Sequence, residues 1–109
     1  MSGSVTEFDR NSVLTFTRPN SSVQWWRDAN PVQAAAHDAY ITENYINTGK
    51  MTVAWENTGN ENVTRVATTW SSPEGKLEFL EDPMIVTYLA ARDAYNEANS
   101  ILKNLALSA

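Results

Sequence analysis

The sequence predicts an α+β protein with the ferredoxin-like element order β-α-β-β-α-β, folded as one domain over residues 1–109. Three observations carry this prediction. Short segments rich in β-branched residues alternate between apolar and polar side chains, as strands do. Segments that begin with a capping residue and a proline read as helix starts. A chain of 109 residues with 42% hydrophobic and 19% charged residues matches a single globular domain.

The first strand is predicted over residues 12–18, where Leu14 and Phe16 share one face and β-branched residues dominate the other. A segment rich in proline, asparagine and serine ends this strand. The sequence around Trp25 then shows no pattern that assigns it to a helix or a strand.

The first helix is predicted to begin with Asn30 as its cap and Pro31 in its first turn. It should run to about residue 47, with Gly49 supplying a left-handed backbone after its end. Its apolar stripe is expected to be Val32, Ala36 and Ala39, with Glu43 in the same line.

Two alternating segments, residues 50–56 and 63–70, flank a loop dense in turn-forming residues and therefore predict a β-hairpin. Ser72 and Asp82 each precede a proline, so we expect a short helix over residues 74–81 and a longer one over 84–99. The expected stripe of the longer helix is Met84, Tyr88, Ala91, Tyr95 and Ala98. Residues 101–107 alternate and are assigned to a fourth strand, with a helix as the alternative.

The fold so predicted is one four-stranded antiparallel sheet with two helices on one face. The other face is expected to carry Val13, Thr15, Thr17, Thr52, Ala54, Val63, Arg65, Ala67 and Thr69. Only Arg65 among these is charged, so this face suits another sheet better than water. Because the chain offers no second sheet, we expect a homodimer with the two sheets facing one another.

Several motifs resemble the dimeric α+β barrel superfamily, which includes antibiotic-biosynthesis-monooxygenase-like and stress-responsive barrel proteins. They are the segments 70–74, 92–96 and 99–101, with Phe79 and the Asp82–Pro83 pair between them. The resemblance implies two ferredoxin-like protomers forming a dimeric barrel, with a pocket between the sheet and the helices of each protomer.

The same resemblance implies which known chemistries this chain lacks. Val66 stands where the quinone-forming monooxygenase branch has an asparagine, and Leu80 stands where the haem-degrading branch has its iron-binding histidine. The strand-end Trp70 is the functional position that matches. We therefore expect neither of these two chemistries in its known form.

Composition excludes further classes of function. The net charge of −5 argues against nonspecific nucleic-acid binding, and no apolar segment is long enough to span a membrane. The chain has no cysteine and one histidine, so we expect no metal, no haem and no other cofactor. The first residues lack the pattern of a secretory signal, which predicts a cytoplasmic protein.

Candidate catalytic residues are few. His37 has two interpretations, an acid–base group or a partly exposed helix residue, and Glu43 is either a general acid or base or a carboxylate that reaches water. Trp70 and Tyr88 complete the catalytic candidates. The acidic residues Glu74, Glu78, Glu81 and Asp82 are better explained by a solvated helix face than by a metal site.

Aromatic residues suggest a pocket. The predicted ligand-binding residues are Phe16, Arg18, Trp26, Tyr40, Trp55, Val66, Trp70, Leu80, Tyr88 and Tyr95. Across from the rings, the first helix offers Ala34, Ala35, Ala36 and Ala39, which permit either a filled core or an open cavity. Either Arg18 or Arg92 is expected to meet a ligand carboxylate at the mouth of such a cavity.

The sequence therefore predicts a homodimer that binds an apolar small molecule, either a fatty-acid-like or an aromatic acid, in a pocket within each protomer. The first alternative is a cofactor-independent monooxygenase or cyclase that acts on an aromatic or polyketide substrate with Trp70 and either Tyr88 or His37. The second is a structural or regulatory dimer without a ligand.

Overall fold

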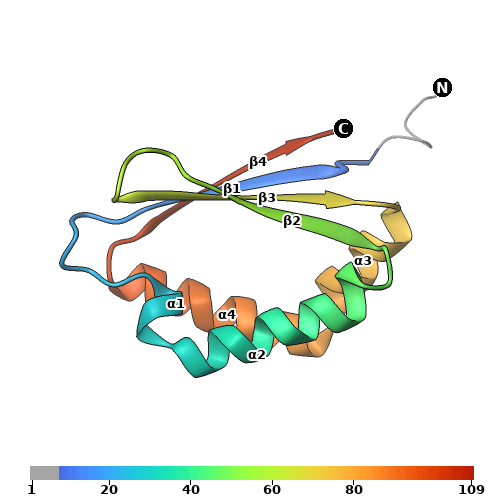
Figure 1. Cartoon of the computed structure of the whole chain (residues 1–109), viewed down its shortest axis with the longest axis horizontal. Helices are drawn as coiled ribbons and strands as arrows, with labels where there is room; N and C mark the ends of the chain where they lie inside the picture. The colour runs from blue at the N-terminus through green and yellow to red at the C-terminus, as the bar shows by residue number, and fades with distance from the viewer. Residues whose placement is uncertain (1–7) are drawn as a thin grey trace.

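The computed structural model describes residues 8–109, and it confirms the ferredoxin-like α+β fold. The strands pair antiparallel in the order β2-β3-β1-β4, and the helices lie together on one side of the sheet (Figure 1). The elements are β1 (Asn11–Thr17), α1 (Trp26–Ala29), α2 (Pro31–Ile41), the π-helix η2 (Thr42–Ile46), β2 (Met51–Glu56), β3 (Val63–Trp70), α3 (Pro73–Glu81), α4 (Pro83–Ala98) and β4 (Leu102–Ser108).

The strand register confirms the predicted division of the sheet into two faces. Phe16 and Val66 are buried on the side of the helices. On the other side, Ala54, Ala67, Val13 and Ala106 form one row across the four strands. The neighbouring row contains Arg65, which pairs with Glu56 at 3.6 Å and so neutralises the charge that the sequence places on this face.

Of the two predicted helix caps, Ser72 is confirmed, and Asp82 caps α4 although the sequence marked it only as the break before that helix. The Ser72 hydroxyl accepts a hydrogen bond from the Gly75 amide at 3.0 Å, and the Asp82 carboxylate accepts one from the Met84 amide at 2.9 Å. The predicted Asn30 side-chain cap is wrong, because its amide group instead donates to the Trp26 carbonyl at 3.1 Å. The side chain is therefore engaged by α1, the short helix that the sequence left unassigned.

The helix predicted over residues 31–47 changes character before it ends. After α2 the chain continues as the π-helix η2, and Gly49 follows with the expected positive φ of 77°. A π-helical turn contains more residues than an α-helical turn, so side chains beyond it rotate relative to those before it. This stretch buries Tyr45 to 2% exposure and provides contacts between the helical layer and β2.

The predicted apolar stripe of α2 is wrong. Val32 is 78% exposed and Ala36 and Ala39 also face solvent, whereas Ala34, His37 and Ile41 turn toward the interior. The large rings of Tyr40 and Tyr45 and the imidazole of His37 bury more surface than alanine methyl groups would, so they determine the rotation of the helix. Of the alanines expected to face the rings, Ala34 alone is buried.

The stripe of α4 needs a smaller correction. Met84 is 61% exposed and Ala91 faces solvent, while Ile85 is fully buried and contributes to the core with Tyr45 and Phe79. Tyr88 and Tyr95 remain partly buried, as predicted. The residues that face inward are therefore shifted by about one position along the first half of the helix.

The fourth strand is confirmed as β4, which forms one edge of the sheet beside β1. Ser100 has a φ of 59° and turns the chain from α4 into the strand, and the Ile101 amide then bonds to the Asn96 carbonyl at 2.8 Å. Within residues 8–109, none of the helices combines the length and the apolar character needed to cross a membrane.

Candidate functional site

The candidate site is built around a stacked pair of rings between α2 and α4. His37 and Tyr88 lie face to face, with ring centroids 3.1 Å apart and planes 8° apart. The indole of Trp26, buried at 6% exposure, meets Tyr88 edge-on at a centroid distance of 4.7 Å. His37 is partly exposed, as one of its two interpretations expects, and its imidazole packs against an aromatic ring.

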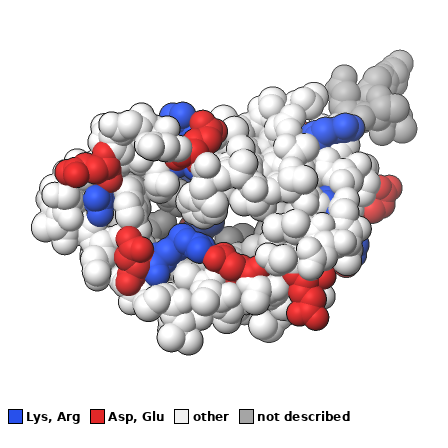
Figure 2. Space-filling model, in the orientation of Figure 1, with Lys and Arg blue, Asp and Glu red and all other residues white. Residues whose placement is uncertain are grey.

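Arg27 connects three elements at the edge of this site. Its guanidinium binds both carboxylate oxygens of Asp38 on α2, one of them at 3.0 Å, and lies 5.3 Å from the ring centroid of Trp55 on β2. Figure 2 shows this side of the molecule hollowed between the sheet and the helices, with basic and acidic side chains along the opening. Arg27 therefore bridges the helical layer and the edge strand by side-chain contacts alone.

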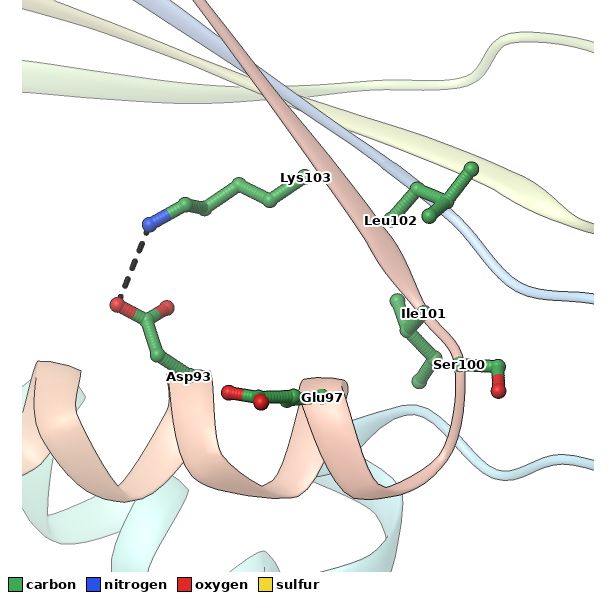
Figure 3. A pocket seen from close by; sticks show the side chains of 6 residues that line it. All are labelled: Asp93, Glu97, Ser100, Ile101, Leu102 and Lys103. Carbon is green, nitrogen blue, oxygen red and sulfur yellow. Dashed lines mark hydrogen bonds and ion pairs between the residues drawn. The ribbon is translucent and has the colours of Figure 1, made fainter.

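Arg92 of α4 lies against the sheet at Phe16 of β1. Its guanidinium lies 5.2 Å from the ring centroid of Phe16 and its side chain is 16% exposed. Asp93 accepts hydrogen bonds from Arg92 at 3.1 and 3.2 Å and from Lys103 of β4 at 3.2 Å. These residues stand beside a pocket of about 380 Å³ between α4 and β4, where Lys103 reaches across to Asp93 (Figure 3).

The electrostatics keep both stacked rings neutral at pH 7. Burial lowers the pKa of His37 to about 4, with the negative charge of Asp38 opposing and the positive charges of Arg27 and Arg92 reinforcing this change. Burial also raises the pKa of the Tyr88 phenol, against the opposing charge of Arg27. The pair therefore offers a neutral imidazole and a protonated phenol as hydrogen-bonding groups, and its imidazole is too weakly basic to remove protons efficiently at neutral pH.

We expect the His37 imidazole to titrate near pH 4 instead of near its ordinary value of about 6.5. Because the unfolded chain binds this proton more readily, His37 should reduce the stability of the folded state as the pH falls below about 6.5. Imidazole chemical shifts recorded by NMR across the pH range measure the midpoint. Tyr88→Ala should expose the ring and raise the midpoint, and a wild-type midpoint above 6 would contradict the buried position.

The structure brings some predicted ligand-binding residues together. Phe16, Trp26, Trp55 and Tyr88 lie around the site through the contacts described above. Val66 packs beside Phe16 in the same core cluster, and Tyr95 packs against that cluster while its hydroxyl donates to the Gln24 carbonyl at 2.8 Å.

Other predicted residues lie elsewhere. Trp70 is 4% exposed and packs in a second core cluster, against which Tyr40 is packed. Leu80 is 49% exposed on α3 and lines a depression of about 150 Å³ with Leu77 and Phe8. Glu43 faces solvent, in agreement with the simpler of its two interpretations.

Arg18 links two loops by hydrogen bonds and is not part of the candidate site. Its guanidinium donates to Asn62 Oδ1 at 3.1 Å and to the carbonyls of Val23 and Glu61 at 2.9 Å, and it lies over Trp25. These contacts hold the β1–α1 connection against the β2–β3 loop. A guanidinium so fully engaged has little capacity left for a ligand.

Sequence reasoning missed Arg27 and Asp38. They lie in different helices, eleven residues apart, and no motif marks them as partners. Two of the four acidic residues in and after α3 have individual partners, since Glu78 pairs with Lys50 and Asp82 accepts two tyrosine hydroxyls. Across residues 8–109, no three histidine or acidic side chains gather as they would around a metal ion.

Comparison with solved structures gives matches that cover nearly the whole chain. A variant of SnoaB, a cofactor-independent oxygenase from Streptomyces nogalater, has a TM-score of 0.57 at 12% identity, over 91% of this chain and 89% of that chain. A protein assigned to the antibiotic biosynthesis monooxygenases, from Deinococcus radiodurans, has a TM-score of 0.56 at 13% identity, with the same coverage. The chain shares the fold of these proteins. This confirms the fold that the motifs around Trp70 implied.

The likeness to the antibiotic biosynthesis monooxygenases lies in the path of the backbone. No family model matches the chain, and no curated protein matches its sequence. At 12–13% identity the shared fold does not transfer individual site residues. The function must therefore be argued from this chain's own side chains.

Proposed function

We propose that the protein binds an apolar small molecule carrying an acid group, fatty-acid-like or aromatic, between the sheet and the helical layer. The observation that carries the proposal is the gathering of neutral aromatic rings and a guanidinium between the helices and β2, in a molecule that Figure 2 shows hollowed between the sheet and the helices. Aromatic walls with a few oriented polar groups are typical of small-molecule sites.

The chemistry of the walls supports an amphipathic ligand. Trp55 is 51% exposed although it lies on the helix-facing side of the sheet, so part of its indole is available to an apolar group. The nearby His37 and Tyr88 are uncharged at neutral pH and offer no ionic partner for a cation. The guanidinium groups of Arg27 and Arg92 favour an anion, and a carboxylate fits their planar fork.

We further propose that the protein acts as a homodimer in which two sheets face one another. The face opposite the helices is built from small or β-branched residues, and its Arg65 is already paired with Glu56. Sheets that pack face to face bury surfaces of this composition.

The alternative is a cofactor-independent monooxygenase or cyclase, and the observation that favours it is the shared fold with SnoaB. In this chain, Tyr88 and His37 are the candidates for such a role, since Trp70 packs in a separate part of the core. Oxygen consumption in the presence of an aromatic acid would distinguish turnover from binding.

Isothermal titration calorimetry with C12–C18 fatty acids and naphthoic acids tests the proposal. We expect saturable binding, an affinity that rises with chain length until the space is full, and tryptophan quenching. Trp55→Ala should weaken binding by about tenfold or more, because it removes the exposed aromatic wall.

Leu77→Ala is the matched control, since Leu77 is also about half exposed but lies on α3 beside the separate depression. This variant should bind as the wild type does. Circular dichroism establishes that the protein is folded. If the folded protein binds neither the fatty acids nor the naphthoic acids, the structural or regulatory dimer is the remaining interpretation.

A further inference from the structure

The strongest unexplained feature of the site is the position of Arg27. Its guanidinium joins α1 to two other elements, through the ion pair with Asp38 on α2 and the contact with the ring of Trp55 on β2. None of these contacts is deeply buried, because the side chains of Arg27 and Asp38 are 37% and 49% exposed. An ion pair this accessible to water contributes little to stability.

The geometry of the pair is that of carboxylate recognition. Arg27 donates from both terminal nitrogens to both oxygens of Asp38, so its fork already holds a carboxylate in the bidentate manner. The ring of Trp55 stabilises the cation from another side. A ligand carboxylate could take the place of Asp38 without loss of hydrogen bonds, and the released Asp38 would be hydrated.

The other arginines at this end of the molecule are less suited to this exchange. Arg18 is engaged by three oxygen acceptors, as described above. Arg92 is 16% exposed, and its partner Asp93 is also held by Lys103, so releasing Arg92 would disturb two ionic contacts. Arg27 has one acidic partner, an exposed one, and an aromatic surface beside it.

We infer that Arg27 is the residue that receives the ligand's acid group, exchanging the carboxylate of Asp38 for that of the ligand at the hollow beside β2. This inference rests on the proposed function and narrows it to monocarboxylates whose apolar part lies against Trp55. Arg27 supplies the preference for acids, and Asp38 acts as an internal competitor that lowers the affinity for acids without affecting that for neutral analogues. The site therefore selects acids over alcohols of the same length.

The test compares decanoate with 1-decanol, and 2-naphthoate with 2-naphthalenemethanol, by calorimetry on the full chain. The wild type should bind each acid about tenfold more tightly than its alcohol, the size expected for one charge-assisted hydrogen-bonding contact. Arg27→Gln should reduce the affinity for the acids to that for the alcohols. Asp38→Asn should do the opposite and raise the affinity for the acids while leaving the alcohols unchanged.

Two further variants keep the result interpretable. Arg27→Lys keeps the charge but not the fork, and should retain only part of the preference for acids. Arg10→Gln removes an equal charge from an exposed residue that lies over Phe8, away from the hollow, and should bind as the wild type does. Circular dichroism and thermal unfolding establish that each variant is folded.

The outcomes separate the inference from the function on which it rests. If acids and alcohols bind but Arg27→Gln changes neither, or weakens both equally, the role of Arg27 is wrong and the binding function stands. An unchanged affinity for acids in Asp38→Asn would overturn the exchange. If the folded wild type binds none of the four compounds, both the function and the inference are wrong.

Discussion

Ala54→Arg should convert the proposed dimer into monomers at micromolar concentration. Ala54 lies in the row formed with Ala67, Val13 and Ala106 on the face opposite the helices, where the substitution would place a guanidinium between two packed sheets. An unpaired buried charge costs about 3–5 kcal/mol, so the dissociation constant should rise at least about 100-fold. Sedimentation velocity measures the change directly.

Ala36→Arg is the matched control for this experiment. It makes the same substitution at an exposed position on the outer side of α2. This variant should remain a dimer, which separates the effect of the sheet face from that of added charge. A wild type that sediments as a monomer, or an Ala54→Arg protein that stays dimeric, would show that the sheets do not meet in this way.

Asp82→Ala should lower the free energy of unfolding by about 3 kcal/mol. Asp82 Oδ2 accepts hydrogen bonds from the hydroxyls of Tyr40 and Tyr45, each at 2.6 Å, while Oδ1 caps α4 at the Met84 amide. Removing the carboxylate leaves the hydroxyl of Tyr45, a residue only 2% exposed, without its partner. Such a loss costs about 1–3 kcal/mol, and the lost cap adds about 1 kcal/mol.

Urea denaturation of Asp82→Ala, Tyr45→Phe and the double variant measures this contribution. The double variant should lose less than the sum of the two single losses, because both changes remove the same hydrogen bond. Tyr45→Phe alone should be milder than Asp82→Ala, since it removes the hydroxyl and keeps the ring in the core. Additive losses would show that the two residues act independently.

The same cluster predicts how stability depends on pH. Hydrogen bonds from Tyr40 and Tyr45 lower the pKa of Asp82, so its contribution is complete above the unfolded value of about 3.8 and is lost as the pH falls through the lowered pKa. The pKa values of Tyr40 and Tyr45 are raised, for Tyr40 mainly by the bond to Asp82 and for Tyr45 mainly by burial. Their contributions are complete below pH 10 and are lost in stronger alkali. Asp82→Asn should remove the part of the acid dependence below pH 3.8.

Local chemistry was sufficient to predict the four strands and the three longer helices, but not the short helix α1 or the π-helix η2. The strand β3 has the bounds expected from its alternating residues, α3 begins at the predicted cap Ser72, and α4 begins after the predicted break at Asp82. These signals act between neighbours in the chain, through side-chain alternation or through a hydroxyl or carboxylate bound to an amide two or three residues away. These signals can therefore be recognised in the sequence without knowing which distant residues come into contact.

The sequence by itself determined the order of the four strands and the longer helices and the composition of the two sheet faces. The tertiary structure alone decided which sides of α2 and α4 face inward, because alanine-rich helices have weakly distinguished faces and a few large rings outweigh them. It also decided the site. His37 meets Tyr88, and Arg27 meets Asp38 and Trp55, through contacts between separate elements that no local pattern records.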